Sequence, residues 1–220
     1  WTDEPGGTQL PDPTDPTDPT DPTDPQSPVG EGSGDGASPE GQDPQDLAEP
    51  GEPSTNATAL QLTAWEAFEA VRIEAGIGMP AQDDALNAAA QAHADYFSLH
   101  AESYSDTGLN PHEENPDWED GFTGVGIGER FSYHGVAAGG GGEVMAFTGS
   151  AQGAVHGWMD TLYHRIPFVH PNTHQWGFGI AEGGAKCEVM DYTQGPPIAL
   201  GASTWTTAGK LGVPWPAPGA

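Results

Sequence analysis

Two neighbouring stretches decide the fold of this chain: GEVMAF at residues 142–147 and GWMDTLYHRIPFVHPNTHQWGFGI at residues 157–180. The first presents an isolated acid, Glu143, directly after a run of glycines. The second starts with the spacing of an amphipathic helix, which we expect to end near His164 because Pro167 cannot continue it. The two stretches therefore predict an acid ahead of a helix and a histidine at its end.

The region after this helix predicts a β-hairpin. A strand over Gln175–Ala181, a turn at Gly183–Gly184 and a strand over Lys186–Thr193 follow one another. A further strand is expected over Ala199–Thr206. Alternating helical and extended segments of these lengths predict a mixed fold.

Two further histidines, His170 and His174, flank the turn that precedes the hairpin. With His164 they give spacings of six and four residues, which a metal site can use. Histidines at turns also serve as caps for backbone groups, so both interpretations stay open.

Two amphipathic helices are predicted ahead of these stretches. The first has an apolar face from Leu60 to Ala75 and ends at Gly76. The second begins after the cap residue Asp83 and buries a stripe that includes His93. We interpret His93 as a core histidine bonded to backbone rather than as a ligand.

Residues 101–142 form an irregular, glycine-rich region that we expect to be a long loop. Loops of this length in compact domains are usually functional or mobile. This one holds His112 and, two residues later, Glu114. Its end at Gly139–Gly142 is predicted to be a flexible excursion, because neither a lysine nor a preceding strand marks it as a phosphate-binding loop.

The first 53 residues are of low complexity, with the three-residue repeat PDPTDPTDPTDPTDP at residues 11–25. Proline at every third position favours the polyproline II helix, and the acidic residues repel each other and extend it. We expect residues 1–53 to be a disordered spacer that holds a domain away from a surface; an acidic ligand-binding or calcium-binding tail is the alternative. Residues 54–220 predict one α+β domain with its own core.

The composition excludes several classes of protein. The 220 residues include 5 Lys and Arg against 33 Asp and Glu, a formal net charge of −28, so we expect no nucleic-acid partner. No apolar run is long enough to span a membrane. The single cysteine, Cys187, rules out a disulfide framework, and its place within a strand predicts a small buried residue.

Four segments together resemble the CAP superfamily, which comprises cysteine-rich secretory, antigen 5 and pathogenesis-related 1 proteins. The resemblance is to the disulfide-free bacterial form and covers about residues 60–192. The segments are, in order, FEAVRIEAGI at residues 68–77, ALNAAAQAHADYF at 85–97, HEENPDWEDGFTGVGIGERFSYHG at 112–135, and GEVM at 142–145 with the pattern from Trp158 to His164.

The resemblance implies a three-layer α-β-α sandwich and a cleft with two histidines and two acids. The matching positions are His112 and His164 for the histidines and Glu143 for one acid. The second acid does not map directly, because Thr161 stands where the family has glutamate. We assign Glu114 in its place because it lies two residues from His112. We therefore expect the fold to bring these residues into one polar cleft.

Such a set supports several kinds of chemistry. The two histidines, with a carboxylate, can hold a divalent cation such as zinc or magnesium. Without metal, a histidine beside a glutamate can act as a general acid or base. A third alternative is purely structural, with the cluster cross-linking loops. No convincing nucleophile accompanies the set.

The leading hypothesis is a non-enzymatic, monomeric CAP domain that binds a ligand at the cell envelope or outside the cell. The alternatives are a metal-assisted hydrolase of peptide or cell-wall material and a lipid-binding module. The chain begins at Trp1 without a methionine or signal peptide, so we expect that a leader has been removed, which leaves open a lipid anchor at that end.

Overall fold

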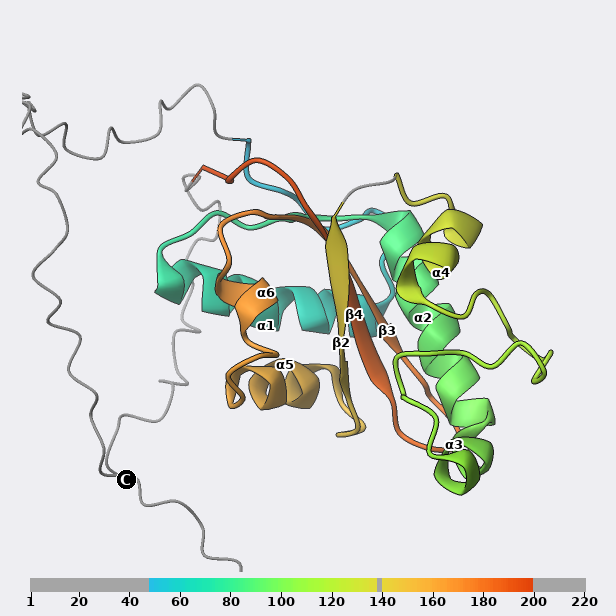
Figure 1. Ribbon diagram of the computed structural model, residues 1–220. Helices are drawn as coiled ribbons and strands as arrows, with labels where there is room; N and C mark the ends of the chain where they lie inside the picture. Colours follow the sequence, from blue (N-terminus) through green and yellow to red (C-terminus); the bar gives the residue numbers. More distant parts are fainter. Residues whose placement is uncertain (1–47, 138–139, 200–220) are drawn as a thin grey trace, which may run out of the picture. The chain divides into compact units, whose positions relative to one another are not determined.

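The structure of the protein, a computed structural model, describes residues 48–137 and 140–199 (Figure 1). Its centre is a four-stranded sheet in the order β1-β3-β4-β2. Strand β1 runs parallel to β3, whereas β3 with β4 and β4 with β2 are antiparallel. The strand bounds are β1 Ala81–Gln82, β2 Gly141–Ala146, β3 Thr173–Ile180 and β4 Glu188–Gln194.

Helices cover both faces of this sheet (Figure 1). One face carries α1 (Ala59–Ala75), α5 (Ala151–Met159) and α6 (Ile166–Val169). The other carries α2 (Asp84–Leu99) and α4 (Ile127–His134), and α3 (Ala101–Thr107) follows directly on α2. The predicted α+β class and three-layer α-β-α arrangement are confirmed.

Local capping residues delimit the first two helices as the sequence predicts. Thr58 forms a capping box with Gln61 at the start of α1, and Gly76, at a φ of 69°, ends it. The Asp83 carboxylate accepts hydrogen bonds from the first backbone N–H groups of α2. The predicted hairpin is confirmed as β3 and β4.

Alternate residues of the strands face different layers, because side chains of a strand point to opposite faces. On the α1 and α5 side, Val144, Trp176 and Met190 enter an aromatic-rich core. On the α2 side, the neighbouring positions include Glu143 and Asp191. Strands β2 and β4 therefore border an apolar layer on one side and carry acids on the other.

Helix α2 rests directly on the backbone of β3. A Cβ added at Gly177 would lie 2.1 Å from the carbonyl carbon of Leu86, and one added at Gly179 would lie 2.3 Å from that of Ala90. The amide of Asn87 accepts a hydrogen bond from the Phe178 N–H at 2.9 Å. Glycine in β3 thus permits a close helix-to-sheet contact that any side chain would prevent.

Three local predictions differ from the structure. Residues 101–142 contain α3 and α4 rather than one loop, and the glycine run leads into β2, where it was expected to be flexible. The helix expected to reach His164 ends at Met159. Pro167 then lies in the first turn of α6, where its missing N–H breaks no helical bond.

The folded domain begins before the predicted boundary at residue 54. Ala48 forms a parallel bridge with Ile198, and the Gly51 N–H donates to the Met79 carbonyl at 2.7 Å. Residues 1–47 of the predicted spacer, and all but the first residue of the strand expected over Ala199–Thr206, lie outside the described residues. Within the described part of the chain, no helix combines the length and hydropathy that crossing a bilayer requires.

Candidate functional site

A cluster of charged side chains lies between the sheet and the layer of α2 and α4. Its members come from four separate segments of the chain, and four of the five are nearly or fully buried. We call them the charge cluster: His93 of α2, His112 and Glu114 of the loop before α4, Arg130 of α4, and Glu143 of β2.

Glu143 is the centre of the charge cluster. Its Oε1 accepts a hydrogen bond from His112 Nδ1 at 2.7 Å, and its Oε2 accepts one from Arg130 Nη2 at 2.6 Å. Burial alone would raise the pKa of Glu143, but the hydrogen bond from His112 and the charges of His93, Arg130 and His112 together lower it to about 2. Glu143 is therefore a carboxylate at neutral pH.

His112 is the one member of the charge cluster that reaches solvent. Its side chain is 41% exposed, whereas that of Glu143 is 3% exposed. A hollow of about 250 Å³ is lined by His112, Ile127 and Glu143. Among the described residues, no hydrogen-bond partner lies on His112 Nε2. The open part of the cluster is thus an imidazole whose other nitrogen is held by a buried carboxylate.

Arg130 fixes the loop to the strand. Its guanidinium is fully buried and donates from Nη1 to the His112 carbonyl at 3.1 Å as well as to Glu143. Gly124 makes the close approach possible, since a Cβ there would lie 2.5 Å from the Cβ of Glu129. Arg130 therefore holds the backbone of His112, Glu143 holds its ring, and the two holding residues are bonded to each other.

His93 and Glu114 form a second pair beneath this contact. His93 Nδ1 lies 3.0 Å from Glu114 Oε1, and Nε2 lies 3.0 Å from the Pro111 carbonyl. Glu114 Oε2 also accepts from the backbone N–H groups of Thr123 and Gly124. Both ring nitrogens of His93 thus face oxygen atoms, and the pair ties α2 to the loop before α4.

A sixth ionisable group, Asp191 of β4, lies next to the charge cluster. It is directly opposite Glu143 in the antiparallel β2–β4 pair and is fully buried. Among the described residues, neither of its oxygens has a hydrogen-bond partner. A cross-strand pair of acids at this depth is an unusual arrangement, since like charges opposite each other are destabilising.

The sequence model of the cysteine-rich secretory protein (CAP) family matches residues 65–193, more than half of the chain. The chain belongs to the CAP family. The match contains the whole charge cluster and Asp191, so all the contacts described above lie inside the CAP domain. No curated protein matches the chain significantly.

Three solved structures are similar to this chain at low sequence identity. An extracellular protein containing an SCP domain from Bacillus anthracis is 18% identical, with a TM-score of 0.44 over 64% of this chain and 45% of that one. An outer surface protein from Borrelia burgdorferi is 14% identical (TM-score 0.44; 61% and 91% covered). Venom allergen-like protein 4 from Schistosoma mansoni is 13% identical (0.42; 66% and 92%). This chain thus spans less than half of the length of the Bacillus protein.

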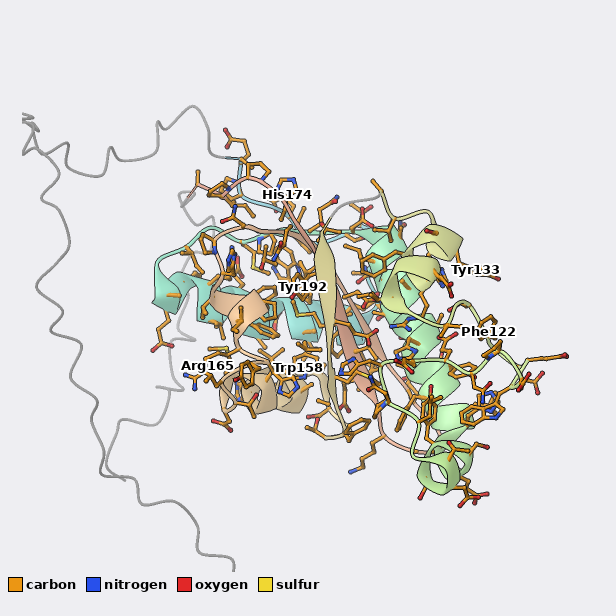
Figure 2. All side chains as sticks on the ribbon, in the orientation of Figure 1. Phe122, Tyr133, Trp158, Arg165, His174 and Tyr192 are labelled. Carbon is orange, nitrogen blue, oxygen red and sulfur yellow. The ribbon has the colours of Figure 1, made fainter. Side chains whose placement is uncertain are left out.

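The CAP domain brings together three of the four residues predicted to form the cleft: His112, Glu114 and Glu143. His164 does not join them. It lies in the turn between α5 and α6, and its Nδ1 is 2.8 Å from Thr161 Oγ1. The reason is the early end of α5, whose core contacts hold this turn on the opposite face of the sheet, where the adjacent Arg165 is labelled (Figure 2).

The other two predicted histidines do not share a site. The His170 carbonyl accepts from Arg72 Nη1 at 2.7 Å, and His170 Nδ1 accepts from the Asn172 N–H at 3.1 Å. His174 lies in β3, with its ring against Gly195, and its Nδ1 has no hydrogen-bond partner among the described residues. His170 therefore caps the turn, which is the second of the two interpretations that the sequence left open.

The charge cluster does not fit the zinc or magnesium ion that two histidines with a carboxylate were expected to hold. Both oxygens of Glu143 are already bonded, and one of them contacts the Arg130 cation. Within residues 48–137 and 140–199, no group of three or more His, Cys, Asp or Glu side chains is arranged to hold a metal ion. No metal-dependent step is therefore derived from this site.

Three members of the site were not found by sequence reasoning: His93, Arg130 and Asp191. His93 was correctly placed in the core and on backbone, but its bond to Glu114 makes it part of the cluster. With it, the CAP domain does assemble two histidines and two glutamates. Arg130 was a usable signal in the sequence. It is one of 5 Lys and Arg residues against 33 Asp and Glu, so an ion pair with a carboxylate could have been predicted for it.

Proposed function

We propose that this CAP domain is an extracellular binding module that holds a small polar ligand in the hollow over His112 and Glu143. The family description of secretory proteins and the acidic, proline-rich spacer ahead of the domain support the location. The partly exposed His112 ring above an otherwise buried cluster supports the binding role.

The observation that carries the proposal is the fixed state of the His112 ring. Since Glu143 is ionised, the short contact at Nδ1 is an N–H donating to the carboxylate. In the neutral ring, Nε2 then has a lone pair and accepts a hydrogen bond from a ligand. Beside it, Ile127 offers an apolar wall. The matching ligand is a small molecule with a hydroxyl or amide donor next to an apolar edge.

Ring-nitrogen NMR of the full chain tests this directly. Soluble cell-envelope fragments, namely disaccharide-peptides and lipid headgroups, are added one at a time, together with Zn²⁺ and Mg²⁺ as metal controls. We expect at least one fragment to shift the His112 Nε2 signal and to lose binding in His112→Ala. His164→Ala is the matched control, because that histidine lies across the sheet and should leave binding unchanged.

Failure of every fragment to move the His112 signal would contradict the binding role. A response to Zn²⁺ alone would instead replace the proposed ligand with a metal. Labelling of intact cells of the source organism with a membrane-impermeant reagent tests the location separately, and mass spectrometry of the natural protein shows whether its front end carries a lipid.

A second candidate function is hydrolysis by general-base catalysis. The carboxylate–imidazole pair orients the His112 ring with its free nitrogen outward, as a base that activates water requires. Peptide and glycan substrates of cell-wall type, assayed with the wild type and with His112→Ala, separate this from binding. Turnover that His112→Ala abolishes would establish an enzyme, whereas saturable binding without turnover supports the binding module.

A further inference from the structure

Asp191 is a fully buried acid that the proposed binding role does not use. Every charged group that faces it belongs to the site: Glu143 from β2, Arg130 from α4 and Glu114 from the loop before α4. Of these, only Arg130 is a cation. Its terminal nitrogens bond Glu143 and the His112 carbonyl, and its buried Nε has no hydrogen-bond partner among the described residues, Asp191 included. Asp191 has no donor of its own among the described residues.

An ionised Asp191 would therefore be a buried charge with no hydrogen bond, directly beside the Glu143 carboxylate. Such a state is costly, because burial removes water and the neighbouring charge has the same sign. A protonated Asp191 removes both problems. It loses its charge, and its new O–H is a donor that lies opposite the acceptor oxygens of Glu143 in the strand pair.

We propose that Asp191 is a positioning residue that keeps its proton, donates a hydrogen bond to Glu143 and thereby holds the carboxylate that orients His112. This inference rests on the proposed binding role of His112 only for its functional meaning. The protonated state and the hydrogen bond do not depend on that role. They are inferred from the burial of Asp191, from its unpartnered oxygens and from its position opposite Glu143 in the β2–β4 pair.

The electrostatics of the site agree with this assignment. Burial raises the pKa of Asp191 well above its usual range, and the charge of Glu143 raises it further, against a smaller opposite effect of Arg130. The pKa of Glu143 is lowered instead, by the hydrogen bond from His112 and the charges of His93, Arg130 and His112. Two adjacent acids with opposite shifts share one negative charge, as expected when one proton is held between them.

Glu143 then accepts three hydrogen bonds, from His112, Arg130 and Asp191. Two of these come from helix or loop segments, and the third comes from the neighbouring strand. The third bond restrains the carboxylate within the sheet, so that its Oε1 stays in line with His112 Nδ1. Loss of this restraint should weaken the His112 contact without removing any residue that touches a ligand.

Infrared difference spectroscopy of the wild type against Asp191→Asn tests the protonated state. We expect the wild type at neutral pH to show the carbonyl band of a neutral carboxylic acid that Asp191→Asn lacks. Asparagine has nearly the same shape and can donate an N–H to Glu143, so this variant should fold. Absence of the band would overturn the proposal, because Asp191 would then be ionised.

The exchange rate of the His112 Nδ1 hydrogen, measured by NMR without any ligand, tests the positioning role. We expect Asp191→Asn to keep the wild-type rate and Asp191→Ala to raise it by up to about tenfold, which corresponds to the loss of one hydrogen bond. Equal rates in both variants would contradict positioning. If Asp191→Ala does not fold, Asp191→Ser keeps a shorter donor and should give an intermediate rate. Because neither measurement uses a ligand, failure of the binding proposal remains distinguishable from failure of this one.

Discussion

The two faces of the central sheet hold the domain together by different physical means. Toward α1 and α5, the strands bury aromatic and aliphatic side chains such as Phe178 and Met190, which need no partner to be stable in the interior. Toward α2 and α4, the same strands bury Glu143 and Asp191, which are stable only when bonded or protonated. A substitution on the first face should reduce stability in proportion to the side-chain volume removed. A substitution on the second face should reduce it in proportion to the hydrogen bonds and ion pairs lost.

The largest effect is expected from truncation on the apolar face. Trp176→Ala removes a fully buried ring that packs edge to face with the ring of Phe68, at 4.9 Å between the ring centroids. We expect a loss of about 3–5 kcal/mol in the free energy of unfolding, measured by urea denaturation. Tyr163→Ala, at a side chain that is 78% exposed, is the matched control and should cost less than about 0.5 kcal/mol. Similar losses in both variants would refute the assigned core.

A somewhat smaller loss is expected when the buried ion pair is broken. Arg130→Met leaves the Glu143 carboxylate without its buried guanidinium partner, and should cost about 3 kcal/mol. The double variant Arg130→Met with Glu143→Leu should cost less than the sum of the single changes, because no unpaired charge remains. Additive costs in this double-mutant cycle would show that the pair does not interact.

Acid should weaken the polar face selectively. The pKa of Glu143 is about 2 in the folded protein against an ordinary 4.5, so its contribution to stability is full above about pH 4.5 and is lost as the pH falls toward 2. We expect a loss on the order of 3 kcal/mol over this range. Asp191 contributes with the opposite sign, because its raised pKa favours the folded state at low pH. The change in the free energy of unfolding with pH is best measured in the Asp191→Asn variant, which lacks the opposite contribution of Asp191. Adding Glu143→Gln to that variant should abolish the loss that comes from Glu143.

The smallest effect is expected at the histidine that the structure places across the sheet. His164→Ala removes only the contact with Thr161 and should change the free energy of unfolding by less than about 0.5 kcal/mol. The NMR signals of the His112 ring should not move. A shift of those signals would show that the two histidines communicate, and would weaken the contrast between the two faces.

Sequence reasoning succeeded where a few neighbouring residues decide the local structure. The caps at Thr58 and Asp83, the end of α1 at Gly76 and the β3–β4 hairpin all have signals within a few residues. It failed for α4 and β2, because short, glycine-rich segments have little periodicity and take their form from the layers that they contact.

The site was predictable in part for the same reason. His112 and Glu143 were found as ionisable residues in the expected order of segments, and Glu114 by its nearness to His112. His164 was placed with them because the pattern from Trp158 to His164 resembles that of the CAP family, and the early end of α5 was not visible in the sequence. Asp191 depends on the register of β4 against β2, which no local pattern encodes.

The bare backbone of β3 under α2 has an effect beyond packing. Because Gly177 and Gly179 have no side chains, α2 lies directly on the backbone of β3. The distance of α2 from the sheet then sets how near His93 comes to Glu143, and Nε2 of His93 lies 3.7 Å from Oε1 of Glu143. These two buried glycines thus set the spacing within the charge cluster. A substitution at either glycine would lift α2 from the sheet and widen the cluster without changing any of its charged groups.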